Sequence, residues 1–337
     1  MPVNVAVVGA AGAVGRKVVE ILEERDFPVG RLLLMATARS AGSTIRFRGR
    51  DYTVQPVAPD LFEGVHIAFF AVPSQVSREL APEAVKRGAV VIDKSNAFRS
   101  DPSVPLVVPE VNADALTGHQ GIVSSPNCST IQLVLVLKPL DDLATVKRVV
   151  VSTYQAVSGT GREAVEELFT QMEHALAGRP LTPEVYPHPI ALNVLPHIDD
   201  FDPNGYSREE MKLVNETRKI MDRPDLAVSA TTVRVPVEVG HSEAVWIETE
   251  RRIPPADARA ALERAPGVVV EDDPGRGVYP LPVRAAGRDE VFVGRIREDI
   301  SHERGLALWI VADNLRKGAA TNAVQIAEAL MERGLTG

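Results

Sequence analysis

Short apolar runs alternate with helical spacing along the first third of the chain. The runs cover 3–8, 32–35, 66–71 and 89–93. The first is almost wholly apolar, which is typical of a parallel strand covered on both faces. Between the first two runs one face of a helix is marked by Val14, Val18, Ile21 and Leu22. This alternation predicts a doubly wound α/β sheet.

Beyond residue 127 the pattern is richer in strands, and the helices are longer. β-branched or alternating runs predict strands over 146–154, 227–237, 241–246, 291–296 and 306–312. Helices are predicted over 162–177 and 314–333, and the last of these has an apolar stripe. We therefore expect two domains, one formed by 1–127 together with 315–337 and the other by 128–314.

Composition narrows the class of protein without identifying it. The 337 residues are 45% hydrophobic and 24% charged, which is ordinary for a globular protein. The formal net charge is −8, and the sequence has no cluster of basic residues that could bind a nucleic acid. The single cysteine excludes an internal disulfide and fits a reducing compartment. No apolar run approaches the ~20 residues of a membrane span, and the first residues are typical of a strand instead of a signal peptide. We expect a cytoplasmic protein without nucleic-acid or membrane partners.

A glycine-rich segment separates the first strand from the first helix. It reads Gly9-Ala10-Ala11-Gly12-Ala13-Val14-Gly15, a G-x-x-G-x-x-G spacing. Glycines after a strand let the main chain approach a pyrophosphate at the N-terminus of the next helix. A tight structural turn is the alternative. The flanking strand and helix favour dinucleotide binding, with candidate contacts from Gly9, Ala11, Gly12, Ala13 and Val14.

The residues after the second strand bear on the choice between NAD and NADP. In NAD-binding folds an acidic residue near the end of this strand holds the ribose hydroxyl. This chain has no acid there and carries Thr37, Arg39 and Ser40 instead. A guanidinium with hydroxyl side chains suits a 2′-phosphate, so we predict NADP. An ordinary solvated arginine is the competing interpretation.

The only cysteine lies between a short apolar run and a longer one. Pro126 and Asn127 break the preceding strand, so Cys128 is predicted in the first turn of a helix. The unpaired N–H groups and the dipole at a helix start favour an anion, and they can lower the pKa of a cysteine thiol. A buried apolar filler is the ordinary alternative for a lone cysteine. From this segment alone, nucleophile and filler both stay open.

Polar residues on one predicted helix have two different spacings. Ser207 and Glu210 have the spacing of a capping box, which is a structural role. Glu209 and Lys212 lie three residues apart and share a helix face. A solvated ion pair is the default interpretation of those two.

Two further polar residues fall on strands. Arg234 points away from Val233 and Val235 in the alternating run, and it could lie near His241 on a neighbouring strand. A buried, hydrogen-bonded histidine is the ordinary alternative for His241. No histidines have metal-ligand spacing, so no metal is predicted.

Taken in order, these segments closely resemble the aspartate-semialdehyde dehydrogenase family, and the resemblance covers essentially the whole chain. Its motifs are Gly9–Gly15, Arg39-Ser40, Ala97–Arg99, Ser125–Gln132, Gln155–Gly161, Glu209–Lys212, Arg234 with His241, Ala285–Arg297 and Asn314–Ala320. The run from Pro126 to Thr130 is the most telling of them. The chain departs from the family pattern at Phe70–Ser74 and at Lys94.

The resemblance implies a reaction and its chemical roles. The reaction is the reductive dephosphorylation of L-aspartyl 4-phosphate by NADPH to L-aspartate 4-semialdehyde, on the route to lysine (through diaminopimelate), methionine and threonine. Cys128 would form a thioacyl-enzyme, with His241 as its acid/base partner. Gln155 would orient the acyl group, and Asn127 would lie near the oxyanion.

The resemblance also implies how substrate and cofactor are held. Arg99 and Lys212 would bind the phosphate, Arg234 the α-carboxylate and Glu209 the α-amino group. Further contacts to NADP would come from Ser158, Gly159 and Asn314.

The implied fold is a Rossmann-type doubly wound parallel sheet plus an α+β catalytic and dimerisation domain. By resemblance we expect a homodimer, with a homotetramer as the other possibility. A reductase of another acyl phosphate or thioester is the nearest competing function. A non-catalytic NADP-binding scaffold is a competitor from another class.

Overall fold

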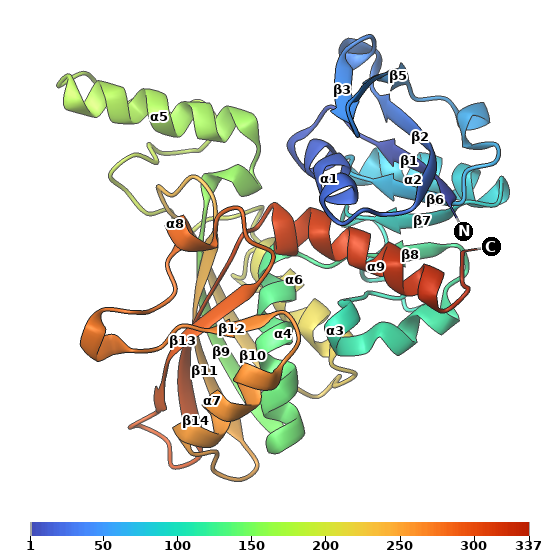
Figure 1. The fold of residues 1–337 in the computed structure, drawn as a ribbon. Helices are drawn as coiled ribbons and strands as arrows, with labels where there is room; N and C mark the ends of the chain where they lie inside the picture. The colour runs from blue at the N-terminus through green and yellow to red at the C-terminus, as the bar shows by residue number, and fades with distance from the viewer. Residues whose placement is uncertain (1, 337) are drawn as a thin grey trace. The chain divides into compact units, whose positions relative to one another are not determined.

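The computed structural model describes residues 2–336, and these fold as two compact units (Figure 1). One unit comprises the described residues up to Asn127 together with those from Ala319 onward, and the other is Cys128–Gly318. Among the described residues, no helix combines the length and the apolar character needed to cross a bilayer.

The first unit is built on a parallel sheet in the order β5-β2-β1-β6-β7-β8. Its strands are β1 (Val3–Val8), β2 (Val29–Ala36), β5 (Gln55–Pro56), β6 (Ile67–Phe70), β7 (Val90–Asp93) and β8 (Ile122–Ser124). The order changes direction at β1, which is the switch point where doubly wound sheets bind ligands. The sheet predicted from the apolar runs is confirmed.

Helices cover both faces of this sheet, as alternating burial requires. Val5 and Val7 pack with α1 (Ala13–Glu24) and α9 (Thr321–Glu332), whereas Ala6 and Val8 face α2 (Ser74–Lys86). The unit also contains the short helix α3 (Pro109–Asn112) and the hairpin of β3 (Thr44–Phe47) and β4 (Arg50–Thr53). Because β1 is buried on both faces, its sequence is almost continuously apolar.

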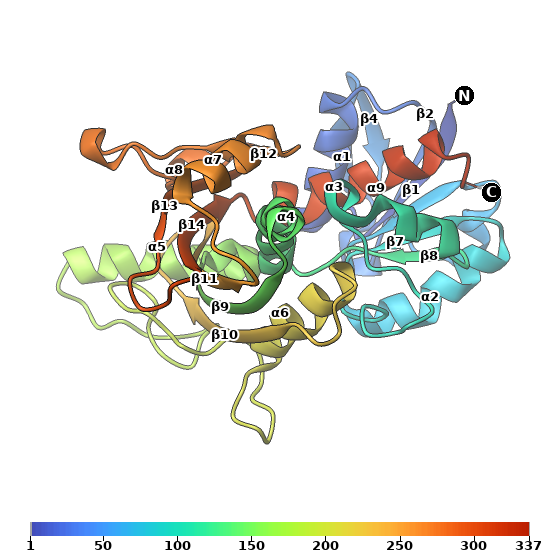
Figure 2. The same cartoon turned by 90° about the horizontal axis from the view of Figure 1, so that it is seen from below.

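The second unit is built on a mixed sheet in the order β10-β9-β11-β14-β13-β12. Its strands are β9 (Val146–Gln155), β10 (Ala227–Arg234), β11 (His241–Thr249), β12 (Val268–Val270), β13 (Val291–Glu298) and β14 (Gly305–Ala312). Its helices are α4 (Cys128–Leu143), α5 (Arg162–Leu176), α6 (Arg208–Ile220), α7 (Pro255–Arg264) and α8 (Pro282–Ala285). Figure 2 shows α4 end-on against the concave side of this sheet.

Alternation along the strands divides the second sheet into an inner and an outer face. In β11 the inner residues His241, Glu243 and Val245 are fully buried, whereas the outer Trp246 is exposed. The inner face is apolar along most of β9 and β11 but becomes polar where the two strands approach the start of α4. That polar end is where the candidate site lies.

One sequence expectation about this unit is wrong. β10 and β11 are not neighbours, because β9 lies between them. In β10 the buried side carries Thr232 and Arg234, whereas Val233 between them is half-buried. The predicted helix over 314–333 also differs: a π-helical turn, Arg316–Ala320, precedes α9.

Candidate active site

Cys128 is the first residue of α4, as predicted. It forms no disulfide and is half-buried, whereas Ser129 through Leu137 are buried. A Cβ on Gly318 would lie only 2.9 Å from the Cys128 Cβ, so the main chain of the π-helical turn passes close to the cysteine. Single π turns inside helices recur at functional sites. Gly318 was not predicted, because its role depends on a contact between distant segments.

Ala156 holds two of the predicted site residues with its own main-chain groups. Its N–H donates to Nδ1 of His241 at 3.0 Å, and its carbonyl accepts from Nη1 of Arg234 at 2.8 Å. Both side chains are almost completely buried. The structure therefore brings Arg234 and His241 together across β9, although the two residues do not lie on adjacent strands.

The same hydrogen bond sets the state of the imidazole. A main-chain N–H can only donate, so Nδ1 of His241 is an acceptor and a neutral ring carries its hydrogen on Nε2. A Cβ on Gly159 would lie 3.3 Å from this Nε2 and 3.1 Å from Nη1 of Arg234. Gly159, predicted as a cofactor contact, therefore lies directly beside both side chains.

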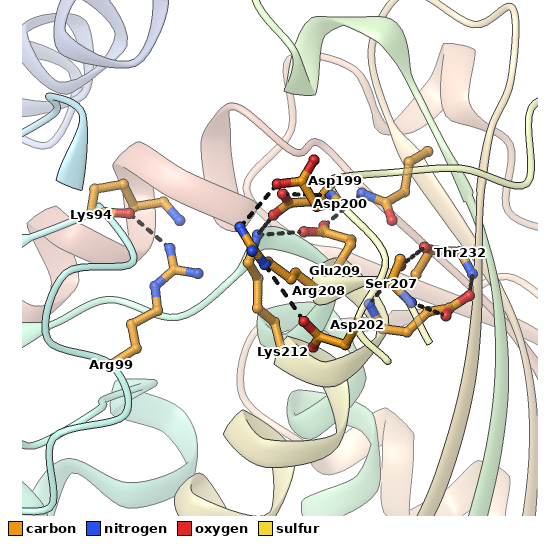
Figure 3. Close-up of polar contacts among 12 residues, drawn as sticks. Lys94, Arg99, Asp199, Asp200, Asp202, Ser207, Arg208, Glu209, Lys212 and Thr232 are labelled. Carbon is orange, nitrogen blue, oxygen red and sulfur yellow. Dashed lines mark hydrogen bonds and ion pairs between the residues drawn. The ribbon is translucent and has the colours of Figure 1, made fainter. Parts of the chain in front are cut away.

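Gln155, Glu209 and Lys212 form one connected network, shown in part in Figure 3. Nε2 of Gln155 donates to Oε1 of Glu209 at 3.1 Å, and Nζ of Lys212 donates to Oε2 of Glu209 at 3.0 Å. Glu209 is 5% exposed, so this is not the solvated ion pair of the default interpretation. The predicted capping box of Ser207 and Glu210 is confirmed at the start of the same helix.

Asp199 is a member of this network that sequence analysis missed. It accepts a hydrogen bond from Nζ of Lys212 at 2.8 Å and lies in an irregular loop with a left-handed φ of 67°. Burial lowers the pKa of Lys212, but the charges and hydrogen bonds of Glu209 and Asp199 outweigh it, so the pKa is raised overall. Burial raises the pKa of Asp199, and Lys212 with the Asp200 amide more than offsets this. The ammonium is thus held between two carboxylates.

Ser158 and Asn314, both predicted as cofactor contacts, lie together in the second unit. Nδ2 of Asn314 donates to Oγ of Ser158 at 3.0 Å, and the Gly240 N–H donates to Oδ1 of Asn314 at 2.9 Å. Gly240 precedes His241 directly, so Asn314 ties the start of β11 to the loop after β9. Their amide and hydroxyl groups are engaged in the fold as well as available near the site.

The glycine segment of the first unit divides into two kinds of position. Gly9 has φ +85°, and a Cβ there would lie 2.2 Å from the Ala71 carbonyl oxygen; a Cβ on Gly15 would lie 2.2 Å from the Gly9 carbonyl oxygen. A Cβ on Gly12 would meet only one atom, at 3.4 Å. Gly9 and Gly15 are therefore required by the fold, whereas Gly12 is not. The first turn of α1, which follows Gly12, has no side-chain cap, so its N–H groups face outward as a pyrophosphate site needs.

Thr37, Arg39 and Ser40 lie at the carboxyl end of β2. A 3₁₀ turn, Ala38–Ser40, follows the strand and leaves Arg39 exposed. Among the ion pairs of the described residues, none includes Arg39. An exposed guanidinium between two hydroxyl side chains fits a 2′-phosphate group, and no carboxylate within this turn would compete with it.

Arg99 is buried in the loop after β7. Its Nη2 donates to the Lys94 carbonyl at 2.7 Å, and Nζ of Lys94 donates to the Pro126 carbonyl at 2.6 Å (Figure 3). Hydrogen bonds from Ser95 to the buried Asp93 carboxylate shape the beginning of this loop. Asn127, the last residue of the unit, is also buried and directly precedes Cys128.

Comparison with known proteins identifies both units. Residues 4–119 match the family model "Semialdehyde dehydrogenase, NAD binding domain", and residues 137–317 match "Semialdehyde dehydrogenase, dimerisation domain". The chain is 53% identical to the aspartate-semialdehyde dehydrogenase of Aquifex aeolicus over 99% of its length and 100% of the relative. It is 51% identical to that of Bacillus subtilis over 98% of each.

Solved structures agree with these relatives. Aspartate-semialdehyde dehydrogenase II of Vibrio cholerae, complexed with ASA, superposes with a TM-score of 0.96 at 46% identity, covering 98% of this chain and 99% of that one. The Candida albicans enzyme, solved with NADP, has a TM-score of 0.76 at 25% identity, covering 99% of this chain and all of that one.

Gly159 generates a prediction about the geometry of the site. We expect Gly159→Ala to lower kcat/KM at least about tenfold, because the added methyl displaces His241 and Arg234 and small misplacements of reacting groups are costly. The melting temperature should change little. The measurement is steady-state kinetics with thermal unfolding. Gly118→Ala, whose Cβ would meet no atom, is the matched control; wild-type kcat/KM in Gly159→Ala would contradict the prediction.

Proposed function

The chain belongs to the aspartate-semialdehyde dehydrogenase family, and on this premise we propose that the protein converts L-aspartyl 4-phosphate to L-aspartate 4-semialdehyde and phosphate with NADPH. The observation that carries the proposal is the pairing of His241 with Arg234 on the main chain of Ala156, in the unit whose first residue is Cys128. Such a pairing combines a proton donor with a carboxylate-binding group.

We propose that Cys128 is the nucleophile of the first step. Its position at the start of α4 stabilises a thiolate, which attacks the acyl carbon of the substrate. The carbon–oxygen bond to phosphate breaks, phosphate leaves with the electron pair, and a thioester remains on Cys128. Asn127 supports the developing oxyanion, and Gln155, fixed by Thr153 and Glu209, orients the acyl group.

His241 supplies the proton donor. The neutral ring carries its hydrogen on Nε2 because the Ala156 N–H occupies Nδ1. Nε2 can therefore donate a hydrogen bond or a proton to a negatively charged group at the reaction centre. In the reverse reaction, the ring has to release the Ala156 N–H before it can hold a second proton. Of the two predicted roles of His241, acid and base, the hydrogen bond from Ala156 supports the role as an acid more directly.

The charged ends of an amino-acid substrate match the remaining residues. Arg234 suits the α-carboxylate and Glu209 suits the α-ammonium group, since each presents the opposite charge. Arg99 and Lys212 are proposed to hold the phosphate. This grip on both ends of an amino acid disfavours a reductase of simple acyl phosphates, which would not need Arg234 or Glu209.

We propose that the cofactor is NADPH and that 1–127 together with 315–337 form its binding domain. The residues for its pyrophosphate are Gly9, Ala11, Gly12, Ala13 and Val14, and those for its 2′-phosphate are Thr37, Arg39 and Ser40. Ser158, Gly159 and Asn314 complete the set near the nicotinamide. Bound there, NADPH supplies the hydride that reduces the thioester.

We propose that the protein is a homodimer assembled through the outer face of the second sheet. The matching family model is a dimerisation domain. Tyr154 and Trp246 are 38% and 36% exposed on this face, and Tyr154 packs against Trp309 with ring centroids 5.5 Å apart. Along α5, Phe169, Met172 and Leu176 are also exposed. Exposed large apolar side chains on these two elements suggest an interaction site. A cytoplasmic location, which a chain with a single cysteine fits, is proposed with it.

The nucleophile is tested with aspartate semialdehyde, phosphate and NADP⁺, which run the reaction in reverse. We expect Cys128→Ala to abolish phosphate-dependent NADP⁺ reduction while circular dichroism stays that of wild type. An aldehyde of similar length without the α-amino and α-carboxylate groups should be a poor substrate for the wild type. Equal measurable rates for wild type and Cys128→Ala would remove Cys128 from the mechanism. A wild type without activity would favour a non-catalytic NADP-binding protein.

The cofactor is tested by removing the exposed guanidinium. We expect Arg39→Ala to raise KM for NADPH roughly tenfold and to leave KM for NADH almost unchanged, since only NADPH carries the 2′-phosphate. Arg50→Ala, which removes another exposed arginine of the same unit, is the control. Parallel changes in both KM values would remove Arg39 from cofactor selection.

The dimer is tested by sedimentation equilibrium, which should give twice the chain mass for the wild type. Trp246→Arg places a charge on the outer sheet face, and we expect it to shift the protein toward the monomer. Ile300→Arg is the control, because Ile300 is fully exposed in the turn between β13 and β14 and not on a strand. A wild-type monomer, or a Trp246→Arg dimer of unchanged affinity, would contradict this assembly.

A further inference from the structure

Glu243 is a completely buried carboxyl group that the proposed chemistry does not use. It lies in β11, two residues after His241 on the inner face, and both residues are 0% exposed. Neither carboxyl oxygen has a hydrogen-bond partner among the described residues, and no described cation forms an ion pair with it. A buried ionised carboxylate in that position would be very costly.

Among the described residues, no cationic side chain forms an ion pair with Glu243. Thr153 of β9 and Ile310 of β14 lie opposite it in the sheet, and Gln132 of α4 covers it. The titratable groups nearest along these elements are His241 on its own strand and Cys128, one helical turn before Gln132. Glu209 is connected only through Gln155 and Thr153.

Burial is the main reason why the pKa of Glu243 is raised well above its ordinary value. The Gln132 amide lowers this pKa slightly, yet no hydrogen bond of standard geometry joins the two side chains. Complete burial and the lack of a hydrogen-bond partner for either oxygen favour the protonated form of Glu243. A protonated carboxyl group has an O–H donor as well as an acceptor, like the amide of glutamine.

Gln132 connects Glu243 to the active-site histidine. Its Nε2 lies 3.4 Å from the main-chain oxygen of His241, a long hydrogen bond that weakens if the amide rotates. Gln132 also lies four residues after Cys128, so both project from one face of α4. Its neighbour Glu243 is a polar group that can fix the orientation of the amide.

We propose that Glu243 is a positioning residue that works as a neutral acid and, through Gln132, holds the main chain of His241 in place. The proposal depends on the proposed function only for the role of His241. An ionised Glu243 would instead place a negative charge close to the thiolate of Cys128 and disfavour it. Its neutral form gives the site a hydrogen-bonding group without that charge.

The first test is the protonation state, which requires no substrate. Infrared difference spectra between wild type and Glu243→Gln at neutral pH should contain the carbonyl band of one protonated carboxyl group. Glu248→Gln is the control, since Glu248 lies on the same strand but pairs with Arg148 at 2.6 Å, and should give a carboxylate band. A carboxylate band for Glu243 at neutral pH would overturn the proposal.

The second test is the dependence of stability on pH. The raised pKa means that the folded protein holds a proton which the unfolded chain releases above about pH 4.5, so wild-type stability falls as pH rises. The melting temperature of Glu243→Gln relative to wild type should therefore increase between about pH 5 and about pH 8. Glu248→Gln should show no such increase. A constant difference for Glu243→Gln would contradict a neutral Glu243.

The third test separates positioning from stability. Glu243→Gln should keep kcat within about threefold of wild type, whereas Glu243→Leu should lower kcat about tenfold or more with KM nearly unchanged. In the substrate-free proteins, the pH profile of Cys128 alkylation by iodoacetamide should match wild type for Glu243→Gln and shift for Glu243→Leu. Wild-type kcat and alkylation in a folded Glu243→Leu would overturn the proposal. Alkylation and infrared spectra need no turnover. They would therefore still test the role of Glu243 if the protein failed to catalyse the proposed reaction.

Discussion

The two hydrogen bonds of Ala156 are the constraint on which the proposed site depends. Its N–H fixes the imidazole of His241, and its carbonyl fixes the guanidinium of Arg234. Both groups come from one residue in the loop after β9, so neither side chain can move without disturbing the other. Main-chain groups hold their positions better than flexible side chains, which suits a site that has to meet a substrate in a preorganised geometry.

The polar end of the second sheet explains how this constraint is supported. Glu243, Thr153 and Gln155 occupy inner positions next to the apolar Val151 of β9 and Val245 of β11. Each polar group buried there needs a partner or has to stay neutral. Thr153, Gln155 and Glu209 satisfy one another, whereas Glu243 has no partner of standard geometry. The sheet therefore gives up apolar packing at the place where chemistry requires hydrogen-bonding groups.

Local patterns in the sequence predicted those features that depend on neighbouring residues. The alternation of strands and helices in the first unit, the start of α4 at Cys128 and the capping box at Ser207 all follow from spacing within short segments. Features that depend on contacts between distant segments were missed or wrong. Asp199 reaches Lys212 from an irregular loop, Gly318 passes Cys128 in a π-helical turn, and the insertion of β9 between β10 and β11 cannot be read from chain order.

The ammonium of Lys212 shared by two carboxylates has a consequence for selectivity. With Asp199 and Glu209 ionised and Lys212 protonated, two negative charges and one positive charge leave this cluster with one net negative charge. A phosphate group bound beside Lys212 therefore needs further positive charge, either from the ligand itself or from Arg99. A zwitterionic ligand brings its own positive charge to cancel the surplus, so the cluster discriminates by overall charge balance before any detailed fit is made.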